Sequence, residues 1–143
     1  MHQMKRYAAM LLLAAMTLAL STPAYLILVR PSSAVYHRNL FVVATQVIPY
    51  AVCAAIWLPS RNPSAPKIAF GLSTALFVAA CLVYVPVFVH PEIAGGDMVG
   101  LGYILVCFVT TAAVVAISMI AGLTLAIHRR IARRSADRFR SYD

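Results

Sequence analysis

Charged residues are absent from four long stretches of this chain. No Asp, Glu, Lys or Arg lies between Arg6 and Arg30, Arg38 and Arg61, Lys67 and Glu92, or Asp97 and Arg129. Each stretch is longer than the roughly 20 apolar residues that cross a bilayer as a helix. The sequence therefore predicts an all-α integral membrane protein with four transmembrane helices, over residues 7–29, 40–58, 68–89 and 101–127.

The composition is that of a chain buried in lipid. Hydrophobic residues make up 62% of it and charged residues 11%, whereas soluble domains have about 45–50% and about 25%. Four spans leave no room for a separate soluble domain, so we expect one membrane domain over residues 1–143. The first span begins like a secretory signal peptide, but its apolar run continues to Val29, and we expect it to stay uncleaved.

The distribution of Lys and Arg predicts the orientation. Positive residues near the ends of spans remain on the cytoplasmic side, and an even number of spans puts both termini on the same side. Of the 12 Lys and Arg, all but Arg30 and Arg38 fall on the side of the termini. We therefore expect both termini in the cytoplasm (N-in/C-in), with the chain in a bacterial inner (plasma) membrane.

The short connectors favour an up-down-up-down four-helix bundle, in which helices adjacent in sequence are adjacent in space. Lipid tails are as apolar as Leu, so small residues that let backbones approach select the helix contacts. Such residues recur at intervals of four in the last span and, more briefly, in the third: Ser118, Gly122 and Ala126, and Gly71 and Ala75. We interpret them as packing faces within the bundle or, alternatively, as a docking face for another protein or a second copy.

The second span carries a polar patch at depth. The Gln46 amide needs hydrogen-bond partners in hydrocarbon, and it lies one turn from Pro49, whose missing N–H frees a backbone carbonyl. Thr45 and Tyr50 extend this patch on the same helix. We interpret it as interhelical hydrogen bonding, and a pocket for a small ligand or a quinone is the alternative.

Residue types typical of ion-coupled transport or catalysis are missing from the spans. Pumps and antiporters place a carboxylate, Lys or Arg in the bilayer, and the four uncharged stretches contain none. The cysteines lie singly in three different spans, as Cys53, Cys81 and Cys107, and do not form a redox pair. We therefore predict no catalytic residue, no cofactor and no enzymatic activity.

Histidines and acidic residues gather near the outer ends of the spans. His37 and His90 are the histidines on that side, and Glu92 and Asp97 lie in the connector that follows His90. A haem or metal site there is geometrically possible, but no ligand-spaced motif such as HxxxH occurs. We predict no metal site, and whether this cluster binds anything stays open.

The C-terminal tail, residues 128–143, is the only strongly charged segment, and we expect it to continue the last helix into the cytoplasm. Six arginines lie in it: Arg129, Arg130, Arg133, Arg134, Arg138 and Arg140. Each contributes roughly 1 kcal/mol of attraction to an anionic leaflet. Beyond anchoring the topology, the tail is a candidate site for lipids or a partner protein, and not for nucleic acid, because no folded reader accompanies it.

These observations favour a non-catalytic component: an accessory, assembly or regulatory subunit of a larger membrane complex. Its expected partners are membrane lipids and either another membrane protein or further copies of itself. The alternative is a small transporter or channel formed by self-association, with a path lined by residues such as Gln46, Thr111 and Ser118.

Overall fold

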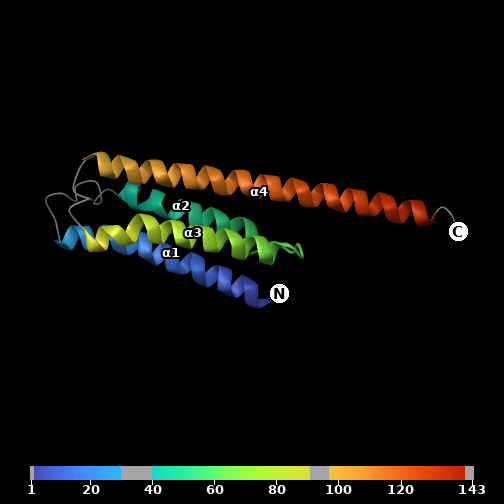
Figure 1. Ribbon diagram of the computed structural model, residues 1–143, viewed down its shortest axis with the longest axis horizontal. Coiled ribbons are helices and arrows are strands. Elements are labelled where there is room, and N and C mark those ends of the chain that lie inside the picture. The colour runs from blue at the N-terminus through green and yellow to red at the C-terminus, as the bar shows by residue number, and fades with distance from the viewer. Residues whose placement is uncertain (1, 30–39, 91–96, 141–143) are drawn as a thin grey trace.

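Four helices make up the regular structure of the computed structural model, which describes residues 2–29, 40–90 and 97–140 (Figure 1). They are α1 (His2–Val29), α2 (Leu40–Trp57), α3 (Ala65–Val89) and α4 (Asp97–Arg140). The predicted all-helical class is therefore confirmed for the described part of the chain. The predicted continuation of the last span into the tail is also confirmed, because α4 runs as one helix to Arg140.

Three of the four helices are long and apolar enough to cross a membrane. The qualifying stretches are Gln3–Val29, Ala65–Val89 and Ile104–His128. The second helix has 18 residues, which at 1.5 Å per residue is about 27 Å, just short of a hydrocarbon core of roughly 30 Å. Its apolar part, Val43–Trp57, counts among the shorter apolar helices.

Proline marks both the start and the interior of these helices. Pro66 occupies the first turn of α3, where a missing N–H leaves no intrahelical bond unmade. Pro23, Pro49 and Pro86 lie inside α1, α2 and α3. Each interior proline removes one backbone hydrogen bond, which membrane helices tolerate because neighbouring groups compensate.

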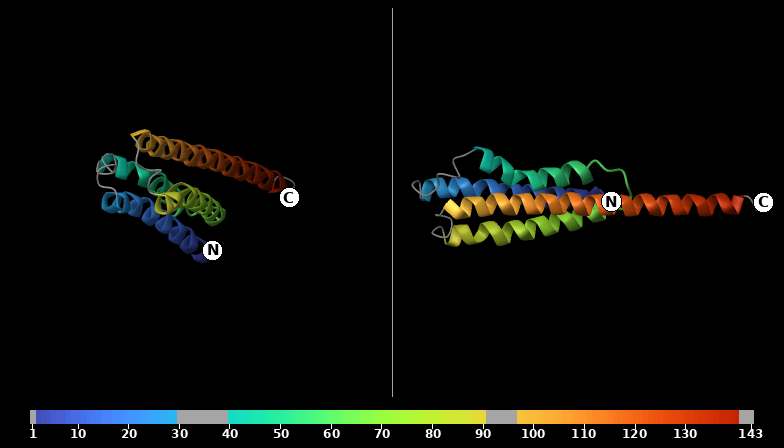
Figure 2. Two further views of the ribbon diagram at one scale, coloured as in Figure 1. Left: turned by 60° about the vertical axis from the view of Figure 1, so that its left-hand side comes forward. Right: turned by 90° about the horizontal axis from the view of Figure 1, so that it is seen from above.

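The helices pair unequally. The largest interface joins α1 to α3, the next joins α2 to α4, and α2 also contacts α1 and α3. Figures 1 and 2 show the N-terminal end of α1 and the C-terminal end of α4 toward the same end of the molecule, with α4 projecting beyond the other three. The last helix is thus held chiefly by α2. The expectation that helices adjacent in sequence pack side by side is wrong for α3 and α4, which share no interface of comparable size.

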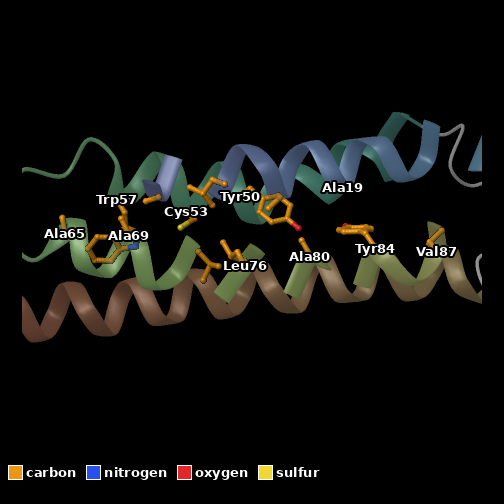
Figure 3. Packing of buried hydrophobic residues seen from close by; sticks show 14 of the residues in the cluster. Ala19, Tyr50, Cys53, Trp57, Ala65, Ala69, Leu76, Ala80, Tyr84 and Val87 are labelled. Atoms are coloured by element: carbon orange, nitrogen blue, oxygen red, sulfur yellow. The ribbon is translucent and has the colours of Figure 1, made fainter. Parts of the chain in front are cut away.

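Small buried residues pack α1 against α3. The buried positions on α1 include Ala8, Ala15 and Ala19, and those on α3 include Ala65, Ala69, Ser73 and Ala80, all between 0% and 2% exposed. Alanines at such spacing let two helix backbones approach closely, which is the contact that lipid-embedded helices favour. Figure 3 shows several of these alanines along the buried face of α3, beside Leu76 and Tyr84.

Candidate functional site

The polar patch predicted on α2 lies inside the bundle. Gln46 is 1% exposed, Thr45 and Tyr50 are each 5% exposed, and Pro49 is also buried. Cys53 and Trp57 continue the same buried face toward the end of the helix. The spacing of three and four residues between these positions puts them on one side of α2, so the patch is part of a longer polar face.

Side chains of α3 and α4 meet the middle of this face. The hydroxyls of Tyr50 and Tyr84 interact through a side-chain hydrogen bond, and the Tyr84 hydroxyl lies 4.0 Å from the Cys107 sulfur. One helical turn farther along, Cys53 interacts with Ser73. These contacts connect α2 to α3, and α3 to α4, through neutral polar groups. Figure 3 shows Tyr50, Cys53 and Tyr84 between the helices.

The far end of the polar face is joined to α4 by one direct bond. The Trp57 indole N–H donates to the Ser118 hydroxyl at 2.9 Å, and both residues are buried. Ser118 was predicted as a member of a small-residue packing face, and its bond to an indole was not foreseen. A Trp and a Ser separated by 61 positions carry no sequence signal that pairs them.

The same end of α2 is capped by a lysine from α1. The Lys5 ammonium donates to the carbonyl of Leu58 at 2.9 Å and to that of Ser60 at 2.7 Å. Carbonyls at a helix C-terminus lack intrahelical partners, and a cation there also complements the helix dipole. The sequence indicated Lys5 only as a topology determinant, whereas in the fold it holds α1 and α2 together.

The Gln46 amide behaves differently from the rest of the face. Its nitrogen and its oxygen are both buried, and neither has a hydrogen-bond partner among the residues that the structure describes. The interhelical bond that the sequence predicted for this side chain is therefore not formed within the described chain. The backbone carbonyl that the missing N–H of Pro49 frees does not bond to Gln46 either, because the Gln46 amide has no hydrogen-bond partner among the described residues.

Two small cavities lie beside this part of α2. One, of about 20 Å³, is lined from α2 by Pro49 and Tyr50 and from the other helices by residues that include Tyr84, Cys107 and Thr110. The other, of about 50 Å³, is lined by Thr45, Ile48, Cys107, Phe108 and Thr111. Residues of α2 and α4 line both cavities, α3 lines the first as well, and Gln46 is not among the lining residues of either.

The predicted small-residue faces divide between the interior and the surface. Ser118 is buried, but Gly122, Ala126, Gly71 and Ala75 are exposed, and a Cβ added at Gly71 or Gly122 meets nothing within 4 Å. These four residues therefore do not pack against another helix of the same chain. On α3 the face that does pack is the one with Ala69 and Ser73. The sequence did not predict this choice, because hydrophobicity and residue size alone do not distinguish the two sides of this helix.

A shallow groove of about 620 Å³ runs along α1 and α3 on the surface of the bundle. Thr17 and Ser21 line it, but their hydroxyls donate to the carbonyls of Leu13 and Leu18 in their own helix. The groove therefore presents apolar surface, as expected for a surface in contact with lipid chains.

Only part of the predicted outer cluster is described. His90 is exposed and follows α3, where its backbone N–H donates to the Pro86 carbonyl at 2.8 Å, and Asp97 begins α4. His37 and Glu92 lie outside the described residues. Within the described chain no three His, Cys, Asp or Glu side chains gather into a group that could hold a metal.

The arginines of the predicted tail site lie on the last turns of α4, which runs to Arg140. Arg130 is exposed, and the side chains of Arg129, Arg133, Arg134, Arg138 and Arg140 lie outside the description. All six arginines therefore belong to one unbroken helix, α4.

The described polar face consists of amide, hydroxyl, thiol and indole groups. Such neutral groups hydrogen-bond to one another or to neutral molecules, and they do not form an acid–base or nucleophile–base pair of the kind that catalysis uses. No protein-family model matches this sequence, and comparisons with curated proteins and with solved structures find no similar chain.

Proposed function

We propose that this protein is a non-catalytic accessory or assembly subunit that docks onto a larger membrane complex through α4. In this proposal the chain forms an up-down-up-down bundle in a bacterial inner membrane, with both termini in the cytoplasm. The observation that supports it is the position of α4, which continues as an apolar helix beyond the end of the bundle (Figure 1).

The level at which the bundle ends is defined by two contacts. Trp57, the last residue of α2, bonds to Ser118, and Lys5 caps the same end. Ser118 is at the midpoint of the 44 residues of α4. At 1.5 Å per residue, the second half of α4 extends about 33 Å past this level.

The first part of that extension is apolar and uncovered. Met119, Ile120 and Leu123 are 65–67% exposed and Ile127 is 48% exposed. Gly122 and Ala126, predicted from the sequence as candidates for close helix packing, are exposed in the same segment. We refer to residues 119–127 as the projecting segment.

No single position of the membrane surface is favourable for both the projecting segment and the charged residues at the end of the bundle. If the membrane surface lies at the level of Trp57, four large apolar side chains of the projecting segment face water, at roughly 1.5–3 kcal/mol each. If the membrane covers the segment instead, Lys5, Arg6, Arg61 and Lys67 move about 15 Å inward, at roughly 2.5–3.5 kcal/mol per charge near the centre. Both placements cost on the order of 10 kcal/mol, and a protein that covers the projecting segment removes the conflict.

Charge favours a different protein over a second copy as this partner. Two copies in one membrane have the same orientation, so docking along α4 would bring their arginine-rich ends side by side, and like charges in such a contact repel. A partner with an acidic cytoplasmic surface avoids this repulsion. Anionic lipids contribute at the same level through the arginines nearest the membrane surface.

Site-directed photo-crosslinking tests the docking proposal. A photoreactive residue at Leu123 is expected to form an adduct with one protein partner in native membranes, and Gly122→Leu is expected to abolish the adduct by blocking close approach. The matched control is the same photoreactive residue at Leu82, which is 73% exposed on α3 and is expected to label lipid. Equal adducts at both positions, or adducts with lipid alone at Leu123, would contradict the proposal, and a homo-oligomer isolated in mild detergent would favour the channel alternative.

Reporter fusions test the proposed orientation. Fusions after Lys67 and after Asp143 are expected to report cytoplasm, and fusions near Ser33 and Gly95 to report the outer side, because the positive residues cluster on the first side. A periplasmic reporter that is active at Asp143 would overturn the orientation.

A further inference from the structure

The surface groove on α1 and α3 is about as long as one leaflet of a bilayer is thick. It is lined from Met10 to Ser21 on α1 and by Phe77, Cys81 and Val85 on α3. At 1.5 Å per residue its α1 side is about 17 Å long, close to half of a hydrocarbon core of roughly 30 Å. Met10 is exposed, so the described chain does not cover this apolar surface. One acyl chain of a lipid matches both the length and the apolar lining of the groove.

Each of the two helices carries a cation at the N-terminal end of this groove. Arg6 lies one turn before Met10, and the two positions differ by only about 40° around α1. Lys67 and Val85 are 18 residues apart on α3, which is five full turns at 3.6 residues per turn, so they lie on the same side of that helix. Arg6 and Lys67 are both exposed. The two sides of the groove thus lead to one positive side chain each.

A contact at the other end of these helices shows that the two cations lie at the same level. The Tyr25 hydroxyl donates to the Phe88 carbonyl at 3.4 Å, and the rings of these residues are 4.9 Å apart. α1 and α3 run in the same direction (Figure 1), so this offset of 63 positions puts Arg6 opposite Ala69, two residues from Lys67. The two cations therefore differ in level by about 3 Å. Their long side chains can extend toward a single headgroup at the membrane surface.

The described part of the chain offers these cations no carboxylate. The sequence has four acidic residues, and the two that lie in described segments are both on α4. Asp97 begins this helix at the opposite end of the bundle (Figure 1). Asp137 lies in its projecting half, about 28 Å past Ser118. Among the described residues, Arg6 and Lys67 therefore have no acidic side chain within reach, and an anion from outside the chain is needed to balance their charge.

We infer that an anionic phospholipid binds here, with its headgroup on Arg6 and Lys67 and one acyl chain in the groove. A guanidinium and an ammonium both donate charge-assisted hydrogen bonds to phosphate oxygens. A zwitterionic lipid has its own cation beside the phosphate, so it gains less from the two side chains. The inference requires the membrane surface to lie at the end of the bundle, and it does not depend on what docks onto α4.

Fluorescence quenching by brominated lipids tests this inference in vesicles. Leu13→Trp in the groove is compared with Val109→Trp on α4, each made with Trp57→Phe so that the chain keeps one Trp. The two positions are matched, because they are 65% and 61% exposed and both lie about 12–14 Å inside the end of the bundle.

Brominated phosphatidylglycerol is expected to quench the groove Trp at a mole fraction at least fivefold lower than brominated phosphatidylcholine. The reason is that each cation near an anionic lipid contributes a factor of about five in affinity. The Trp at position 109 is expected to show no such preference. Equal quenching of the groove Trp by the two lipids, or the same preference at both positions, would overturn the inference.

Charge variants identify the cations that hold the headgroup. Arg6→Gln is expected to reduce the preference for phosphatidylglycerol in the groove at least twofold, and Arg6→Gln with Lys67→Gln to abolish it. The matched control is Arg61→Gln, which removes one exposed charge at the α2 end that Lys5 caps. Lys5 lies about 140° around α1 from Met10, so this control is away from the groove and should leave the preference unchanged. A preference that survives the double variant, or that falls equally in the control, would contradict the proposed site.

Discussion

The Trp57–Ser118 hydrogen bond predicts a measurable coupling energy between the C-terminal end of α2 and the middle of α4. Both partners are buried, and their donor–acceptor distance is 2.9 Å. Ser118→Ala removes the acceptor and leaves a buried indole N–H unsatisfied, at about 1–3 kcal/mol. Trp57→Phe removes the donor, but the remaining Ser hydroxyl can bond to a carbonyl one turn back in its own helix, so the loss of the bond costs less from that side.

The double variant is therefore expected to be less destabilised than the sum of the two single variants. Hydrogen bonds between membrane helices have coupling energies of about 0.6 kcal/mol on average and about 1.7 kcal/mol at most, and we expect a value in that range. Unfolding in mild detergent can be followed by the reaction of a fluorogenic maleimide with Cys53 and Cys107, which are buried in the fold. The chain has one Trp, so its emission spectrum reports on the same bond in Ser118→Ala.

Additive effects would refute this reasoning. Independent sites add within about 0.3–0.5 kcal/mol, so a coupling energy of zero within that range, together with an unchanged emission maximum in Ser118→Ala, would mean that the bond is absent in the membrane. The level assigned to the end of the bundle would then lose one of its two supports.

Two further predictions concern the other contacts of the fold. Lys5→Met is expected to lower the free energy of unfolding by about 1–3 kcal/mol, because hydrogen bonds from a charged group to the carbonyls of Leu58 and Ser60 are lost. Arg6→Met removes the same charge at an exposed neighbour and should have little effect. Equal losses in the two variants would mean that Lys5 acts through its charge alone. Ala69→Leu is expected to cost about 1–3 kcal/mol by overpacking the α1–α3 interface, whereas Gly71→Leu on the exposed side of the same helix should be neutral or slightly stabilising. Thermal unfolding of the four variants tests both pairs, and a Gly71 variant as unstable as the Ala69 variant would show that α3 packs by the other face.

The helices and the buried polar patch of α2 could be predicted because local features of the sequence carry the signal. An uncharged stretch of sufficient length defines a span, and an amide beside an interior proline stands out in any apolar helix. The choice of face on α3 carried no such signal. Small residues occur on two of its sides, as Gly71 and Ala75 and as Ala69 and Ser73, and in lipid the apolar character of the remaining positions does not tell the inside from the outside.

The sequence could not predict the axial register of the helices, that is, where each helix ends relative to its neighbours. The functional proposal depends on this register. The uncharged stretch before Arg129 predicts a span near residues 101–127 regardless of where the neighbouring helices end. The fold, through the bond from Trp57 to Ser118, shows that α2 ends opposite the middle of α4. A span that is ordinary by composition thus becomes, once its register is known, an apolar helix that extends past the positive residues of its own bundle, and this mismatch is the physical reason to expect a protein partner on residues 119–127.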